Sequence, residues 1–128
     1  MACFVVSAAG AAVATAVEKA EEKKELAAAA EKGFSSVHEA SVPLSRKLKW
    51  YTYLLWGGVI LLAFEHIWHG EVVPWFPFLT AMGSAEEASV MFHEMATVGV
   101  AMFALITIVW LGMCFAADAI LRRPAARA

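Results

Sequence analysis

The sequence predicts an all-α integral membrane protein whose central feature is a helical hairpin with two transmembrane helices. Hydrophobic residues make up 61% of the 128 residues, well above the roughly 45–50% of soluble domains. The stretch 50–121 contains no Lys or Arg. It holds two apolar segments, 50–64 and 95–117, separated by a short connection. Two long apolar segments around a short connection are typical of a hairpin that crosses a bilayer twice.

Composition argues against several classes of function. The ten Lys and Arg residues lie in three small groups, so the chain has no basic surface suited to nucleic acid. Cys3 and Cys114 do not make a disulfide framework, and we interpret both as structural. The chain has no CxxC pair, no Gly-rich phosphate loop and no Ser nucleophile with its base. We therefore expect that the protein is not an enzyme.

Residues 1–43 are predicted to form an Ala-rich helical arm and linker, followed by the hairpin domain at 44–128. The first 17 residues are uncharged and small, which leaves three alternatives: a helix docked on the membrane or a partner, a third span, or a cleaved signal. Residues 18–32 are rich in strong helix formers and predict a solvated helix ending at Gly33. We expect His38 to be a solvated linker residue.

The first predicted span follows a basic collar at 45–49 and begins at Trp50. Trp and Tyr near its start favour the headgroup region of a bilayer. Counting about 20 residues, the length of a typical span, places its far end near His69. Gly57 and Gly58 would let another backbone approach closely.

The connection at 70–83 has an unusual composition. Pro74 and Pro77 prevent a regular helix, while Gly70 and Gly83 mark its ends. The residues between them are too apolar for a free loop. We expect this segment to lie on the bilayer interface, to cap the hairpin, or to dock on a partner subunit.

The second helix is predicted to begin at a capping box, with Ser84 as N-cap and Glu87 three residues later. It continues to about Leu121, and Asp118 is placed to pair with Arg122 one turn later. A stripe of small residues predicts the face that contacts the first span. Its members are Thr97, Ala101 and Ala104.

Lys and Arg flank the hairpin at its two open ends and are absent from the connection. The positive-inside rule therefore predicts a multi-pass protein of the cell (inner) membrane. The termini of the hairpin would be cytoplasmic and the connection at 70–83 extracytoplasmic.

A polar cluster is expected where the two helices meet at the outer end. An ionised carboxylate at that depth is costly, so it should be protonated, paired or ligated. Three imidazoles and two carboxylates near one point suit a divalent metal, and two facing imidazoles suit haem. Two alternatives remain. The residues form a hydrated hydrogen-bond network with a structural role only, or they carry proton or quinone chemistry. The five residues are Glu65, His66, His69, His93 and Glu94.

Two runs carry a resemblance: AFEHIWHGEVVPWFPFLTAM at 63–82 and MFHEMATVGVAM at 91–102. They resemble a set of small prokaryotic membrane proteins with no assigned function, over about residues 44–118. The resemblance implies the two-span architecture and adds no activity or site residues. At the level of fold alone, small anchor subunits of respiratory enzymes also look similar.

These observations leave three functional hypotheses open. The first is an accessory or anchor subunit of a larger or homo-oligomeric membrane complex. The second is a membrane protein that binds a divalent metal or haem through the polar cluster. The third is a small oligomeric channel lined by Glu65. The expected partners are the lipid bilayer and either copies of the chain or a larger complex, without nucleic acid.

Overall fold

The computed structural model describes residues 2–32 and 42–123, and within these ranges it is all-α. Helix α1 spans Phe4–Lys32, α2 spans Leu44–Trp68 and α4 spans Val100–Leu121. Three shorter elements precede α4: the 3-10 turn η1 (Thr80–Gly83), α3 (Ala85–Glu94) and the π-helical turn η2 (Met95–Gly99). The linker around His38 lies outside the described residues.

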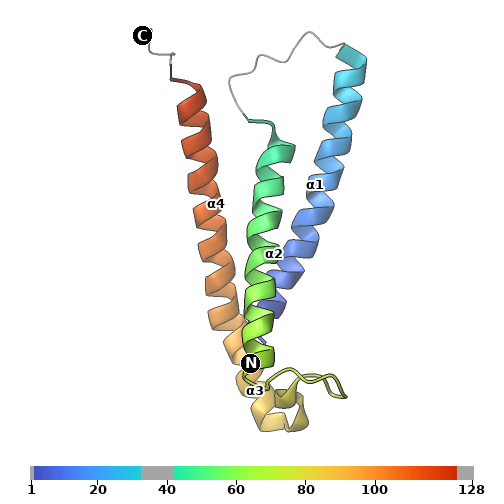
Figure 1. Cartoon of the computed structure of the whole chain (residues 1–128), viewed down its shortest axis with the longest axis vertical. Helices are drawn as coiled ribbons and strands as arrows, with labels where there is room; N and C mark the ends of the chain where they lie inside the picture. Colours follow the sequence, from blue (N-terminus) through green and yellow to red (C-terminus); the bar gives the residue numbers. More distant parts are fainter. Residues whose placement is uncertain (1, 33–41, 124–128) are drawn as a thin grey trace.

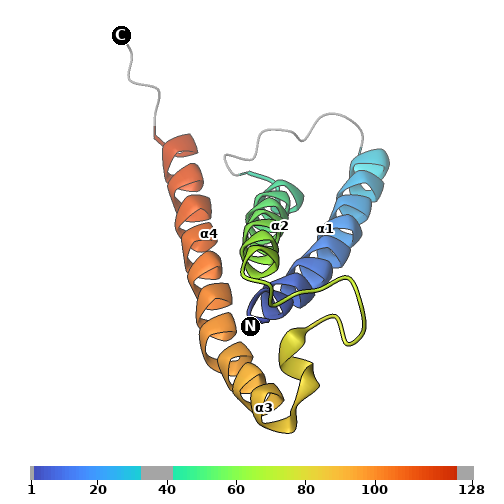
Figure 2. The same ribbon diagram turned by 60° about the horizontal axis from the view of Figure 1, so that its bottom comes forward.

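The three long helices run along a common axis, and α2 lies between α1 and α4 in Figure 1. The connection and α3 close the end where the chain begins. Figure 2 shows that the last helix changes direction between α3 and α4. The π-helical turn η2 lies at this bend, and π-bulges are a known cause of such kinks.

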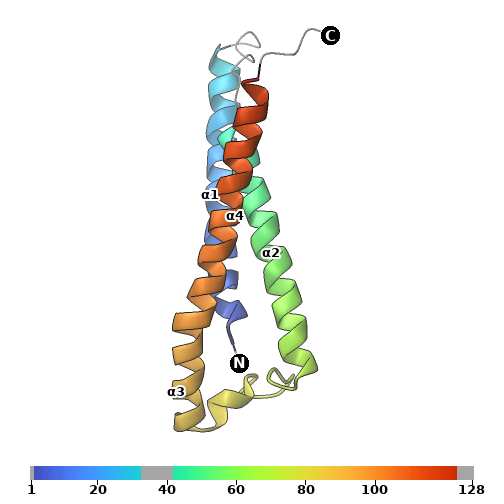
Figure 3. The ribbon, with the colours of Figure 1, turned by 90° about the vertical axis from the view of Figure 1, so that its left-hand side faces the viewer.

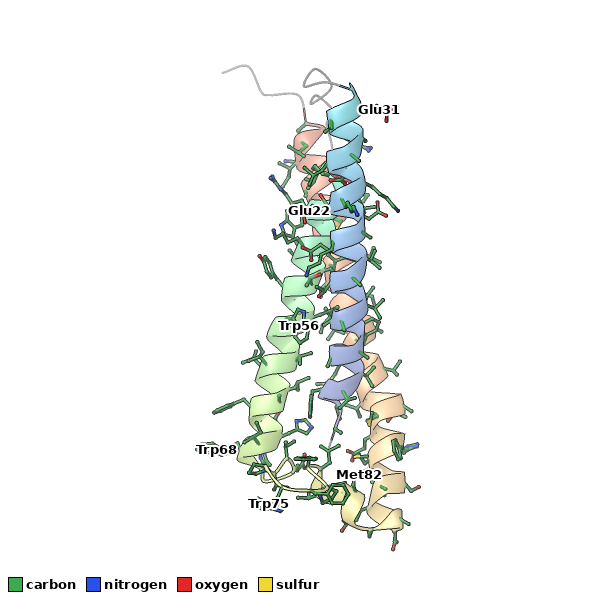
Figure 4. All side chains as sticks on the ribbon, turned by 90° about the vertical axis from the view of Figure 1, so that its right-hand side faces the viewer. Glu22, Glu31, Trp56, Trp68, Trp75 and Met82 are labelled. Atoms are coloured by element: carbon green, nitrogen blue, oxygen red, sulfur yellow. The ribbon has the colours of Figure 1, made fainter. Side chains whose placement is uncertain are left out.

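All Lys and Arg residues that the structure describes lie at one end of the bundle, called the charged end below, where polar contacts join the helices. The backbone N–H of Ser45 donates to the Glu25 carboxylate at 3.1 Å. Lys47 Nζ lies 2.6 Å from Asp118 Oδ2. The sequence predicted Arg122 as the partner of Asp118, but the observed hydrogen bond ties α4 to α2. Glu22 and Glu31 mark this charged end in Figure 4, and Trp68 and Trp75 mark the opposite end.

Helix α1 docks on its own chain. Ala11 and Ala14 are buried against Leu55 of α2, with Tyr51 and Phe103 packed around them. Small Ala side chains let two helix axes approach closely. Helix α1 lies mainly against α2, and its first turns also contact the π-helical turn η2. The three alternatives for residues 1–17, among them a third span, stay predictions. The boundary between the domains 1–43 and 44–128 stays a prediction.

The predicted contact face of the second helix is wrong. All three residues of its small stripe are exposed, and Gly99 and Phe103 lie on the contacting face instead. The reason is α1, which occupies the space beside the π-helical turn. A Cβ on Gly99 would lie 3.0 Å from a Val6 methyl and 3.1 Å from the Cys3 carbonyl oxygen. The exposed residues are Thr97, Ala101 and Ala104.

Polar contacts set the antiparallel register of α2 and α4. The Tyr51 hydroxyl and Thr107 Oγ1 are 2.8 Å apart. Trp110 Nε1 donates to the Lys47 carbonyl oxygen at 2.7 Å, and the Trp110 and Tyr51 ring centroids are 4.7 Å apart. These contacts all lie in the half of the bundle nearer the charged end. Gly57 and Gly58 were predicted to allow a close approach. A Cβ added at Gly58 would lie 3.4 Å from Ile106 Cδ1 of α4, whereas a Cβ added at Gly57 would have no neighbour within 4 Å.

The described residues include one helix that is long and apolar enough to cross a membrane, the continuous run Ala85–Leu121. Only 6% of its most apolar window is buried. Helix α2 falls short of the same test because its aromatic start, its paired glycines and its polar end at Glu65 and His66 lower its hydropathy. The second span of the hairpin therefore stays a prediction.

Two local predictions hold. Ser84 caps α3, since the Glu87 backbone N–H donates to the Ser84 hydroxyl at 3.2 Å. The connection also caps one end of the bundle: Ala81 is buried together with Ala2 of the N-terminal segment and Met91 of α3. The cap therefore joins the N-terminal segment to the connection and α3.

We expect Gly99→Val to weaken the docking of α1, because its side chain would overlap Val6 and the Cys3 carbonyl. Overpacking of this kind costs about 1–3 kcal/mol. Thermal unfolding in mild detergent, followed by tryptophan fluorescence, measures the effect. Gly112→Val is the matched control on the same helix run, because no heavy atom lies within 4 Å of its Cβ position. Equal destabilisation by both variants would contradict the proposed contact.

Candidate functional site

The candidate site is built on the C-terminal end of α2. Gly70 follows the C-cap residue with a φ of +73°. The Glu71 N–H donates to the His66 carbonyl at 2.9 Å and the Gly70 N–H donates to the Ile67 carbonyl at 3.0 Å. This pair of bonds is the Schellman motif, which reverses the chain after a helix. It brings Glu71 back beside His66.

Thr80 holds this reversed segment in place. Its backbone N–H and its hydroxyl both donate to the Glu71 carbonyl oxygen, at 3.0 and 3.2 Å. An isolated antiparallel bridge between Val72 and Leu79 closes the rest of the connection. The position of the Glu71 backbone is thus set from both ends of the loop.

His66 is the most buried polar residue of the site, with 7% of its surface exposed. Its Nδ1 lies 2.6 Å from the Leu62 carbonyl oxygen. Because a carbonyl only accepts, Nδ1 carries a proton. Nε2 then faces the Glu71 carboxylate at 3.7 Å, an ion pair when the imidazole is charged. The His66 and Phe4 rings pack in a T-shaped arrangement with their centroids 5.3 Å apart. Side chains from α1, α2 and the connection therefore meet at His66.

His69 repeats the same arrangement at the surface. Its Nδ1 lies 2.9 Å from the Glu65 carbonyl oxygen, so this imidazole also holds its proton on Nδ1. Together with the carboxylates of Glu65 and Glu71, the two imidazoles line one pocket of about 250 Å³. The pocket can accept and donate protons or hydrogen bonds through four titratable side chains.

Three of the five predicted site residues therefore line one pocket, and two do not. His93 lies exposed on α3 and its carbonyl accepts from Thr97 Oγ1 at 2.8 Å, while Glu94 is partly buried. Figure 3 shows α2 diverging from α3 and α4 toward this end, with the chain start between them. Ala2 and Val5 pack there against Met91. The intervening N-terminal segment is why the two polar groups do not meet.

Glu71 was missed by the sequence prediction. The available signal was Gly70, a residue that often ends a helix in a left-handed conformation and turns the next residue back over the last turn. Within the described residues, no group of three or more His, Cys, Asp and Glu side chains is placed to hold a metal ion. Metal or haem binding by the five predicted residues stays a prediction.

Exposed aromatic side chains surround this end of the bundle. Trp68 is 78% exposed and Phe76 is 85% exposed. Trp75 and Phe78 of the connection are also exposed. Aromatic side chains in this position are typical of the interface between a bilayer and water. These four side chains, called the aromatic rim below, lie at the same end of the bundle as the polar pocket.

Fold and site define a small all-α protein with one candidate membrane span and a polar pocket at the end opposite to its Lys and Arg residues. No protein-family model matches the chain, and no curated protein or solved structure is significantly similar to it. The resemblance to small prokaryotic membrane proteins accordingly stays a prediction.

We expect Gly70→Ala to destabilise the site by about 1–2 kcal/mol, because an L-residue in the left-handed conformation clashes with its own backbone. The same change should also displace Glu71 from His66. Thermal unfolding monitored by tryptophan fluorescence detects the loss. Gly83→Ala is the control at the other end of the connection, where a Cβ meets no atom within 4 Å. Unchanged stability of Gly70→Ala would refute the turn as described.

Proposed function

We propose that the protein is a small integral membrane subunit, not itself an enzyme, that supports a larger or homo-oligomeric membrane complex. One observation carries this proposal: α4, a strongly apolar helix, has no buried residue. A helix that is apolar all round belongs in lipid or against other transmembrane helices. Its large exposed side chains include Leu105, Ile108, Val109, Leu111, Phe115 and Ile120.

The dimensions of the bundle support two spans. At 1.5 Å per residue, the apolar segment 95–117 is roughly 35 Å long and the segment 50–68 is roughly 28 Å long. The hydrocarbon core of a bilayer is about 30 Å thick. The two helices run side by side with their charged ends together (Figure 1). We propose that both cross the membrane as a hairpin.

The charge distribution supports one orientation. The cations of α1, the collar before Trp50 and the end of α4 all lie at one end of the bundle. By the positive-inside rule this end faces the cytoplasm. The pocket around His66 and the aromatic rim then lie on the extracytoplasmic side of the membrane.

A supporting role in an assembly follows from how little the helices bury against each other. The small stripe on α4, mispredicted as the contact with α2, is free to receive a transmembrane helix of another subunit. Small residues are enriched where transmembrane helices associate. The stripe consists of Thr97, Ala101 and Ala104.

Metal binding is a second candidate, favoured by one observation. Both pocket histidines donate Nδ1–H to helix carbonyls, which leaves Nε2 of each imidazole as the atom that could ligate a metal. Elemental analysis of protein purified without a histidine tag tests this candidate.

The oligomeric channel also stays a proposal. It predicts a cation conductance in planar bilayers that Glu65→Gln reduces.

Cysteine labelling tests the hairpin topology in a background where Cys3 and Cys114 are changed to Ser. We expect Ser84→Cys to react with an impermeant maleimide from the outer side. Ala27→Cys and Arg123→Cys should react only after the cells are permeabilised. If α4 alone spans, Ala27→Cys and Ser84→Cys will react on the same side, which would contradict the two-span proposal.

Co-purification tests the subunit role. A tagged copy extracted in mild detergent should recover either a distinct membrane protein or untagged copies of itself. Ala101→Leu, which enlarges the small stripe, should reduce this recovery, while Met113→Leu on a different exposed face of α4 should not. Recovery of the tagged protein only as a monomer would count against the proposal.

A further inference from the structure

An exposed carboxylate lies beside two aromatic rings on the outward face of α2. Phe64 and Trp68 are one helical turn apart, with their ring centroids separated by 6.3 Å and their planes inclined by 29°. Together with Glu65 they line a pocket of about 320 Å³. In Figure 4 the Trp68 side chain points away from α1 and α4, so this pocket is open to a neighbouring molecule.

The chain itself supplies no cation for the Glu65 carboxylate. Among the described residues, no hydrogen bond or ion pair involves this carboxylate. His69 lies one turn later, but its Nδ1–H donates to the Glu65 backbone carbonyl at 2.9 Å. The stretch 50–121 contains no Lys or Arg, and the described Lys and Arg residues lie at the opposite end of the bundle.

The depth of Glu65 makes an unpaired charge costly. Fifteen residues separate it from Trp50, a rise of roughly 22 Å at 1.5 Å per residue. In the proposed two-span arrangement, with a hydrocarbon core about 30 Å thick, the carboxylate lies below the outer headgroups. Ionisable side chains at such a depth face a partner or a water-filled cavity. Because lipid headgroups lie outside the hydrocarbon, the charge favours a cation carried by a protein.

A second copy of the chain does not provide this cation. In the proposed orientation, a neighbouring copy presents the same segment at the same depth, and the segment 50–121 contains neither Lys nor Arg. Two copies that met at this face would bring one Glu65 carboxylate toward another. The charge distribution therefore favours a different protein.

The pairing of a carboxylate with aromatic rings favours Arg over Lys. A guanidinium group stacks on aromatic faces and also binds a carboxylate through two parallel hydrogen bonds. We propose that Phe64, Glu65 and Trp68 form the docking site for an Arg side chain on a transmembrane helix of a distinct partner protein. This inference rests on the proposed membrane insertion and deepens the subunit role, which left copies and a distinct partner open.

A synthetic transmembrane peptide tests this chemistry. The full-length protein is reconstituted in phosphatidylcholine vesicles with a Leu- and Ala-rich spanning peptide that carries one Arg near its outer end. Energy transfer between labels on the two molecules measures their association. We expect the Arg peptide to associate at least tenfold more strongly than the same peptide with Gln in place of Arg. Equal association of the two peptides would overturn the proposal.

Matched variants assign the effect to this pocket. Glu65→Gln should remove the preference for the Arg peptide, while Glu86→Gln, at an exposed carboxylate of α3, should keep it. Trp68→Leu should lower the preference at least threefold, while Trp75→Leu, at an exposed ring of the connection, should not. Equal effects of the site variants and their controls would overturn the assignment.

Photocross-linking in cells tests the natural partner, with benzoylphenylalanine in place of Phe64. We expect a cross-linked peptide from a distinct protein with an Arg in a membrane span. Glu65→Gln should lower the yield at least tenfold. Changing the partner's Arg to Glu should restore the cross-link to Glu65→Arg. A cross-link to a second copy or to lipid would overturn the proposal.

The labelling experiment on Ser84→Cys separates this inference from the membrane proposal. If the topology is that of a hairpin and Glu65→Gln leaves partner recovery unchanged, only the docking site fails. If the topology is wrong, the membrane proposal fails first, and the depth argument for Glu65 fails with it.

Discussion

The packing of α1 against α2, with its first turns against the π-helical turn η2, is the constraint on which the rest of the structure depends. It is possible because two close approaches involve glycine: Gly10 beside the Phe103 ring, and Gly99 beside Val6 and the Cys3 carbonyl. With α1 in place, α2 and the π-helical turn do not meet at the end that carries the pocket. This packing of α1 separates His66 from His93.

The polar pocket is a consequence of how α2 ends. A left-handed residue at Gly70 returns the chain, and the bonds from Thr80 fix the Glu71 backbone beside the last turn. His66 joins this turn to α1 through its contact with Phe4. A change in the charge of His66 would therefore alter contacts with α1, α2 and the connection. His66 is the residue that links the pocket to the helices of the bundle.

The sequence predicted what depends on local rules. The end of α2 near His69, the cap at Ser84 and the all-α character follow from hydropathy and capping chemistry within a few neighbouring residues. The position of α1 could not be predicted, because residues 1–17 are Ala-rich and carry no polar face that would identify a partner. The prediction of the contact face of α4 failed for a related reason. The small stripe at Ala101 was a plausible interface, but periodicity does not show which neighbour a helix face contacts.

Two kinds of force hold the two halves of this bundle. Near the charged end, α2 and α4 are joined by directional bonds, from Trp110 to the Lys47 carbonyl and from Lys47 to Asp118. Near the other end, apolar packing of Ala2, Ala81 and Met91 prevails. Interhelical hydrogen bonds and close packing both join helices in membranes. The charged end is therefore held by directional bonds between α2 and α4, whereas the end that carries the pocket is held by apolar packing.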